Sequence, residues 1–123
     1  VRAGGIDRRE FEMISSVWKL RDEFGVKKAK WLPYWSNADY ASASPAGVYV
    51  SMYRRPGNGG LAYVSNVAGA EQRAEIRLNL KKLGLSDRPL SAKDALTGET
   101  LSISDGILSF SLPSMGWKIV WIR

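Results

Sequence analysis

A tight turn near the C-terminus constrains the fold of this chain more than any other feature. Asp105 and Gly106 are the pair typical of a two-residue type I′ hairpin turn, in which both central residues need positive φ. The register that follows puts apolar residues on one face and hydroxyl residues on the other: Leu101, Ile103, Leu108, Phe110 and Leu112 against Thr100, Ser102, Ser109 and Ser111. In this register Leu101 pairs with Phe110 and Thr100 with Ser111. Because a lone hairpin is marginal in water, a second layer must cover the apolar face.

Other segments have the alternation or the turn punctuation of strands. With the two hairpin strands they make seven, at residues 48–54, 61–66, 72–80, 89–95, 100–104, 107–112 and 117–122. Both faces of the last strand are apolar, which indicates a central position. The sequence therefore predicts a mainly β fold, an antiparallel β-sandwich of about seven strands with one N-terminal amphipathic helix.

Residues 7–24 predict that amphipathic helix. Asp7 suits the N-cap with Glu10 three residues later, Ile6 can pack on Phe11, and Gly25 is expected to end the helix. Apolar residues recur at three- and four-residue intervals along one side: Phe11, Met13, Ile14, Val17, Trp18, Leu20 and Phe24. A stripe this broad needs more than one surface, either the sandwich or a preceding domain.

The chain divides into two parts on this pattern. Residues 1–45 hold the helix and an aromatic-rich linker that packs on the sandwich, and residues 46–123 form the sandwich itself. Within the first part, residues 26–45 predict an irregular connection, because Pro33 and Pro45 interrupt regular structure. The first residue is not an initiator methionine, which favours a processed chain or a fragment of a longer protein.

The net charge of +6 raises the question of a nucleic-acid partner. The basic residues fall in separate small groups: Arg8 and Arg9, Lys27 to Lys30, Arg54 and Arg55, and Lys81 and Lys82. No helix face carries a basic stripe, so we expect solvated surface charge and no nucleic acid. No apolar run approaches the length of a membrane span, and no membrane partner is predicted. Cysteine is absent, so the sequence does not indicate a redox compartment, and export as part of a longer protein is an alternative to the cytosol.

The residue types for most catalytic sites are missing. Without His or Cys the chain lacks the usual triads and zinc ligands, and no phosphate-cradling glycine loop opens a helix. Caps, turns and solvent-facing positions account for most carboxylates, and Asp94 and Glu99 are expected to play surface roles beside the Thr97-Gly98 turn. Only Asp39 lies among aromatic residues, and one acid does not make the pair that glycoside hydrolysis uses. The chain is predicted to be non-catalytic, with no catalytic residue, no cofactor and no metal.

One segment is a candidate binding site for carbohydrate. It offers flat rings and polar groups suited to a sugar, at Trp31, Tyr34, Trp35, Asp39 and Tyr40. The favoured alternative is that these rings pack the helix onto the sheet or seal a contact with another domain. Tyr49, Tyr53 and Tyr63 are likewise interpreted as cross-strand packing.

Two stretches resemble the C-terminal β-sandwich of large bacterial glycoside-hydrolase-like proteins. The first runs from Leu61 to Asn66 and then from Ala74 to Leu85, and the second runs from Asp94 through Thr97-Gly98 and Asp105-Gly106 to Ile119. In those proteins a (β/α)-barrel carries catalysis and the sandwich follows it. The resemblance covers about residues 46–123 and carries over no catalytic acid, because the family's acids lie in the barrel.

This resemblance implies a non-catalytic accessory domain that stabilises or positions a catalytic domain N-terminal to it in the same chain. The helix at residues 7–24 would then be the last barrel helix or a linker helix. A carbohydrate-binding module that uses the aromatic patch at residues 31–40 is the alternative. An independent hydrolase centred on Asp39 ranks last.

Overall fold

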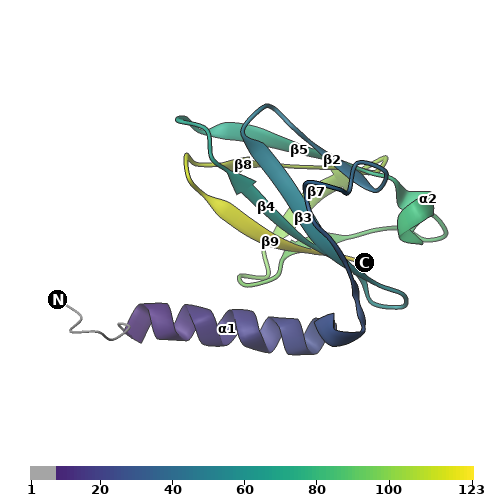
Figure 1. Cartoon of the computed structure of the whole chain (residues 1–123), viewed down its shortest axis with the longest axis horizontal. Coiled ribbons are helices and arrows are strands. Elements are labelled where there is room, and N and C mark those ends of the chain that lie inside the picture. Colours follow the sequence, from purple (N-terminus) through teal and green to yellow (C-terminus); the bar gives the residue numbers. More distant parts are fainter. Residues whose placement is uncertain (1–7) are drawn as a thin grey trace.

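The computed structural model describes residues 8–123, which form a curled antiparallel sheet with a long helix along one side (Figure 1). The helix α1 (Arg8–Phe24) is followed by a 3₁₀ turn at Val26–Lys28, and a short helix, α2 (Leu80–Leu83), follows the fifth strand. The strands are β1 (Lys30–Leu32), β2 (Ala41–Ser44), β3 (Val48–Arg55), β4 (Gly59–Asn66), β5 (Gln72–Leu78), β6 (Ala92–Asp94), β7 (Thr100–Ser104), β8 (Ile107–Leu112) and β9 (Trp117–Ile122). The mainly β, antiparallel prediction is confirmed.

The nine strands follow the order β1-β3-β4-β9-β6-β7-β8-β5-β2, and the sheet curls so that β2 returns beside β3. The central position predicted for the last strand is confirmed, since β9 lies between β4 and β6. Two of the nine strands, β1 and β2, lie in residues 26–45, where the sequence predicts irregular structure. They are three and four residues long, too short for an alternating pattern to show in the sequence.

The core fills the inside of this curl. Inward-facing residues of almost every strand meet there, and the largest fully buried ones are Met52, Ile76, Leu108, Leu112, Val64, Val120 and Ile122. Leu83 and Leu85, from the crossover after β5, are buried in the same cluster, as their apolar character predicts. Each such side chain contributes about 1.5–3 kcal/mol on burial, so the apolar faces decide the register.

The predicted hairpin turn is present between β7 and β8. Asp105 and Gly106 have φ values of 52° and 76°, and the predicted pairs nearest the turn form: Ser104 with Ile107, Ile103 with Leu108, and Ser102 with Ser109. Farther out the predicted pairing is wrong, because Leu101 and Thr100 pair with β6 instead of β8. At this point β7 changes its partner: Thr100 and Leu101 pair with β6, whereas the residues from Ser102 onward pair with β8. Leu101 and Phe110 are nevertheless both buried, as expected.

A fully buried asparagine ties the end of β4 to the link between β8 and β9. The Asn66 side-chain nitrogen donates to the carbonyl oxygens of Ala70, Leu112 and Pro113 at 3.0, 3.1 and 3.1 Å. Its side-chain oxygen accepts from the Ala68 N–H at 2.9 Å. Since buried polar groups need such partners, Asn66 fixes these two loops relative to each other.

The helix α1 is attached to the sheet by its C-terminal end. Leu20 and Phe24 are buried against Leu61 and Ile119 on the outer face of the sheet. The helix ends at Gly25, whose φ of 81° confirms the predicted left-handed terminator. The cap at Asp7 and the contact between Ile6 and Phe11 lie outside what the structure describes.

Two side chains hold this helix end, one from the last residue of β3 and one from the turn that follows it. The Phe24 carbonyl oxygen accepts from Arg55 Nη1 at 2.9 Å and from Asn58 Nδ2 at 2.8 Å. The Trp121 indole N–H donates to the Asn58 carbonyl at 2.8 Å, and its ring meets the Phe24 ring edge-on at 5.5 Å. The end of α1 is therefore fixed to the sheet, and in Figure 1 its other end extends past the strands.

Candidate functional site

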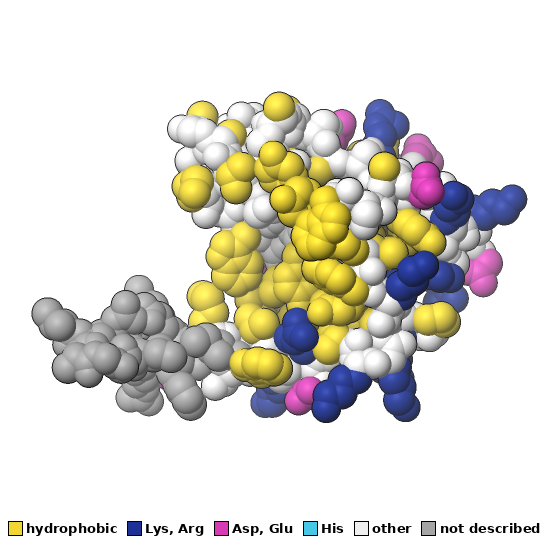
Figure 2. Space-filling view, viewed as in Figure 1, with side chains coloured by type: hydrophobic (Ala, Val, Ile, Leu, Met, Phe, Trp, Pro, Cys, Tyr) yellow, Lys and Arg dark blue, Asp and Glu magenta, His cyan; other side chains and the backbone are white. Residues whose placement is uncertain are grey.

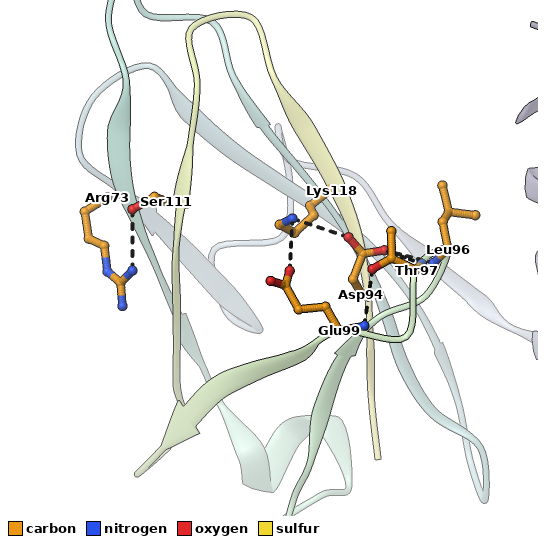
Figure 3. A network of polar contacts seen from close by, with 7 residues as sticks. All are labelled: Arg73, Asp94, Leu96, Thr97, Glu99, Ser111 and Lys118. Atoms are coloured by element: carbon orange, nitrogen blue, oxygen red, sulfur yellow. Dashed lines mark hydrogen bonds and ion pairs between the residues drawn. The ribbon is translucent and has the colours of Figure 1, made fainter. Parts of the chain in front are cut away.

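The one buried carboxylate of the described chain holds a turn. Asp94 Oδ1 accepts from the N–H groups of Leu96 and Thr97 at 2.9 and 3.1 Å, and Oδ2 lies 3.3 Å from Lys118 Nζ. The same ammonium lies 3.5 Å from Glu99 (Figure 3). Asp94 was expected at the surface, but it is 6% exposed, because two amides and a lysine satisfy its oxygens. Its role here is structural.

Between residues 8 and 123, no group of three or more His, Cys, Asp or Glu residues could hold a metal ion. No helix within the same range is long and apolar enough to cross a membrane.

The most unusual surface is the outer face of β1, β3, β4 and β9. Side chains alternate along a strand, so the residues between the core positions point outward, and many of them here are aromatic. We call the resulting surface the aromatic face, and it consists of Trp31, Tyr34, Tyr49, Tyr53, Tyr63 and Trp117. Figure 2 shows the apolar side chains gathered between α1 and the strands above it.

The rings of the aromatic face hold one another in place. Trp31 lies 4.6 Å from Tyr53 and 6.2 Å from Tyr63, measured between ring centroids. Tyr34 meets Tyr49 edge-on at 5.0 Å, and its backbone N–H donates to the Ser51 hydroxyl at 2.9 Å. These contacts fix the rings of Trp31, Tyr34 and Tyr49 although they are 41%, 52% and 42% exposed, and Trp117 beside them is 49% exposed.

An open groove of about 600 Å³ runs over this face. All rings of the aromatic face except Tyr53 line it, and no carboxylate does; the other lining residues are Ser51, Val64, Ser65, Val67 and Lys118. A second groove, of about 500 Å³, continues it toward the helix, where Met13, Val17, Trp18 and Arg21 face Trp117. Met13 and Trp18 are 48% and 61% exposed, so the middle of α1 lacks the cover that its last turn has.

Arg21 lies where the helix meets the aromatic face. Its guanidinium carbon is 5.5 Å from the Trp18 ring and 5.6 Å from the Tyr53 ring. Burial lowers the pKa of Arg21, the Tyr53 hydroxyl raises it, and the net pKa lies above the ordinary value. Burial raises the pKa of Tyr63, and the Arg21 charge opposes that rise. In the described part of the chain, Arg21 Nε and Tyr63 Oη are buried without a hydrogen-bond partner.

The structure brings together only part of the predicted carbohydrate site. Trp31 and Tyr34 line the larger groove, while Trp35 is 70% exposed beside Tyr34 and lines neither groove. Asp39 lies 3.9 Å from Lys82, and the Tyr40 ring lies under Lys30 Nζ at 5.4 Å; neither residue lines these grooves. After Pro33 the chain turns and enters β2, which lies beside β3 where the sheet curls, and Tyr40 stays next to β1 through the Lys30 ammonium, which donates to its hydroxyl at 3.4 Å.

Asn37 fixes that turn. It is buried, and its side-chain nitrogen donates to the carbonyl oxygens of Leu32 and Val50 at 3.1 and 2.8 Å.

The residues that complete the aromatic face, Tyr49, Tyr63 and Trp117, come from strands that are distant in the sequence. Their outward positions in alternating segments were the signal available in the sequence. The predicted cross-strand packing of Tyr53 and Tyr63 is confirmed at 6.0 Å, but Tyr49 is also an exposed part of the groove.

The outer face of the other half of the sheet is different in kind. Its strands present small hydroxyl and charged side chains, namely Ser42, Ser44, Arg73, Glu75, Arg77, Thr100, Ser102, Ser104, Ser109 and Ser111. We call this surface the serine face. Since its composition is that of an ordinary solvated sheet face, the concentration of rings on the aromatic face is a local property.

The family "Glycoside hydrolase 123, C-terminal domain" matches residues 14–97. No curated protein matches the sequence significantly.

Among solved structures, a β-L-arabinopyranosidase of family GH27 from Geobacillus stearothermophilus, in complex with arabinose, is similar with a TM-score of 0.52 and 19% identity. The match covers 68% of this chain and 19% of that one. AmyP in complex with maltose follows with a TM-score of 0.48, 18% identity, and coverage of 66% of this chain and 16% of that chain. The chain thus spans less than a fifth of the length of these proteins, and the first likeness shows a shared fold.

The family match agrees with the resemblance found in the sequence, in which a β-sandwich follows a glycosidase domain. It extends that resemblance back into α1, to Ile14. Because the match covers more than half of the sequence, the chain belongs to the family of glycoside hydrolase 123 C-terminal domains.

Proposed function

We propose that this chain is a non-catalytic accessory domain that docks, through the aromatic face and the exposed middle of α1, onto a catalytic domain preceding it in the same polypeptide. The observation that carries the proposal is the continuity of these two surfaces across Trp117, which lines both grooves. Large exposed apolar surfaces mark interaction sites, and Trp and Tyr are enriched at the centres of protein interfaces.

The direction of α1 supports a partner in the same polypeptide. The fixed helix end lies on the sheet, and the chain N-terminal to it runs beside the aromatic face. A domain attached there has a high effective concentration next to this face, so modest contacts suffice for docking. The family description, which places this domain C-terminal in a glycoside hydrolase, supports a catalytic domain as that partner.

The docking test uses the 123-residue chain and the same chain extended by the sequence that precedes it in its gene. Both are labelled with 5-fluorotryptophan, and a soluble paramagnetic agent broadens the fluorine signals of accessible rings. We expect Trp18, Trp31 and Trp117 to be protected in the extended protein only. Trp35 is the matched control, because it is the most exposed tryptophan yet lines neither groove. Equal accessibility of Trp18 and Trp117 in both proteins overturns the proposal.

Carbohydrate binding is the second candidate for the same face. The observation that favours it is a groove with exposed rings, flanked by the Ser51 and Ser65 side chains and the Lys118 ammonium. Flat rings with a few polar groups suit sugar recognition. Calorimetry of the 123-residue chain against a polysaccharide panel tests it. A heat of binding that disappears in Trp117→Ala and persists in Trp35→Ala supports a sugar site. No heat of binding with the unmodified chain rejects the sugar site.

The non-catalytic part of the proposal has its own test. Asp94 is buried and held by Lys118 at 3.3 Å, Asp39 is an exposed carboxylate 3.9 Å from Lys82, and no carboxylate lines either groove. We expect the 123-residue chain to leave aryl glycosides unchanged. Turnover that Asp39→Asn abolishes would show a hydrolase instead.

A further inference from the structure

We infer that the docked domain presents a carboxylate to Arg21, at the junction between α1 and the aromatic face. The inference rests on the proposed function and says which chemical group the partner brings. It starts from a cation that the described chain leaves without a counter-charge: none of the ion pairs between residues 8 and 123 includes Arg21.

The surroundings of Arg21 restrict what it can bind. Its guanidinium is flanked by the Trp18 and Tyr53 rings at 5.5 and 5.6 Å, and a guanidinium near two ring faces keeps its N–H donors for groups at its edge. Arg21 lines the groove between α1 and Trp117, and no carboxylate lines that groove or the neighbouring one. Arg21 therefore faces an opening in which the described chain supplies tyrosine hydroxyls but no carboxylate.

If docking buries the Arg21 guanidinium, a negative charge on the docked domain must compensate its positive charge. A domain that covers Trp18 and Trp117 also covers Arg21, and an uncompensated buried charge is strongly destabilising. A carboxylate is the most suitable counter-charge, because it accepts two parallel hydrogen bonds from a guanidinium. The net charge of +6 on the chain also favours an acidic patch on the partner.

Tyr63 offers a second donor at the same junction. Its hydroxyl oxygen is buried without a hydrogen-bond partner in the described chain. Burial raises its pKa, so the hydroxyl keeps its proton at neutral pH and can donate it. A small movement of the Arg21 side chain on docking would let one carboxylate accept from both residues.

The first test converts Arg21 into a nucleophile. Arg21→Lys is made in the extended protein, and a water-soluble carbodiimide activates carboxylates. The lysine amine then displaces the activating group as a urea and forms an amide. Peptide mass spectrometry is expected to find residue 21 joined to an Asp or Glu of the preceding domain. The unmodified protein is the first control, because arginine does not react in this way. Lys19 is the internal control, since two residues along a helix place it on the other side.

The second test reverses the charge. Arg21→Glu in the extended protein sets two carboxylates against each other, and the docking equilibrium is expected to fall by about two orders of magnitude. Trp18 and Trp117 should then regain the accessibility they have in the 123-residue chain. Lys19→Glu makes the same change of charge and should leave both protected.

The outcomes separate this inference from the proposed function. Protected tryptophans without a cross-link at residue 21, or with protection that survives Arg21→Glu, overturn the carboxylate and leave docking intact. Tryptophans that are accessible in the unmodified extended protein overturn docking and the carboxylate with it.

Discussion

The two ends of the apolar stripe on α1 should differ sharply in what they contribute to stability. Phe24 is fully buried, and its ring meets Trp121 at 5.5 Å. Removing the ring with Phe24→Ala leaves a cavity beside Leu61 and Ile119. Such truncations cost about 3–5 kcal/mol, of which the ring contact supplies about 0.5–1.5 kcal/mol. A domain of this kind is stable by about 5–15 kcal/mol in total, so the variant loses a large share.

Trp18→Ala is the matched change on the same helix. Trp18 is 61% exposed, so the lost contact is mainly the one with Arg21, worth about 0.5–1 kcal/mol. Urea unfolding of the 123-residue chain, followed by far-ultraviolet circular dichroism, measures both free energies of unfolding. We expect the unfolding equilibrium constant to rise at least about a hundredfold with Phe24→Ala and less than about tenfold with Trp18→Ala. Equal costs, or a larger cost for Trp18→Ala, would show that α1 is attached differently.

Three further predictions concern single positions. Asn66→Leu removes the hydrogen bonds that the side chain makes to three carbonyl oxygens and one amide of the loops, of which the Pro113 carbonyl keeps the Gly116 N–H, and should cost about 1–3 kcal/mol by urea unfolding. A neutral effect would show that Asn66 does not join the two loops. Gly25→Ala should cost at least about 1–2 kcal/mol from its positive φ alone, and its new Cβ would overlap the Arg55 guanidinium, so an unchanged urea midpoint would contradict the described helix end. The pKa of Tyr63 is raised in the folded state, so the stability that its protonated hydroxyl contributes is complete below pH 10 and is lost as the pH rises through the folded pKa. The melting temperature of the unmodified chain should therefore fall more steeply above pH 10 than that of Tyr63→Phe. Melting temperatures that fall in parallel would refute the raised pKa.

Local chemistry explains which parts of the fold the sequence predicts. The turn at Asp105-Gly106 needs only two residues of the right conformational preference, and the pairs beside it follow. The pairing fails at Leu101, because β7 passes there to β6, a strand whose position depends on the whole sheet. The strands β1 and β2 are missed for a similar reason, since their partners β3 and β5 lie outside the segment.

The candidate site shows the same division. A sequence window gathers Trp31, Tyr34 and Trp35 with Asp39 and Tyr40, because they are neighbours along the chain. The sheet instead joins Trp31 and Tyr34 to rings from β3, β4 and β9, and β2 carries the chain beyond Tyr40 to the other end of the strand order. Strand order depends on long-range pairing, which no short window contains. Alternation alone predicts that Tyr49 and Tyr53 share one face of their strand, while the positions of Tyr63 and Trp117 beside them depend on the pairing of β3, β4 and β9.

An experimental structure of the extended protein tests the docking surface most directly. Contacts between domains in one chain bury about 600–1,500 Å². We expect this area to cover Trp18, Trp31 and Trp117 and to leave the serine face in solvent. A preceding domain that packs on the serine face, or that leaves Trp18 and Trp117 exposed, would contradict it.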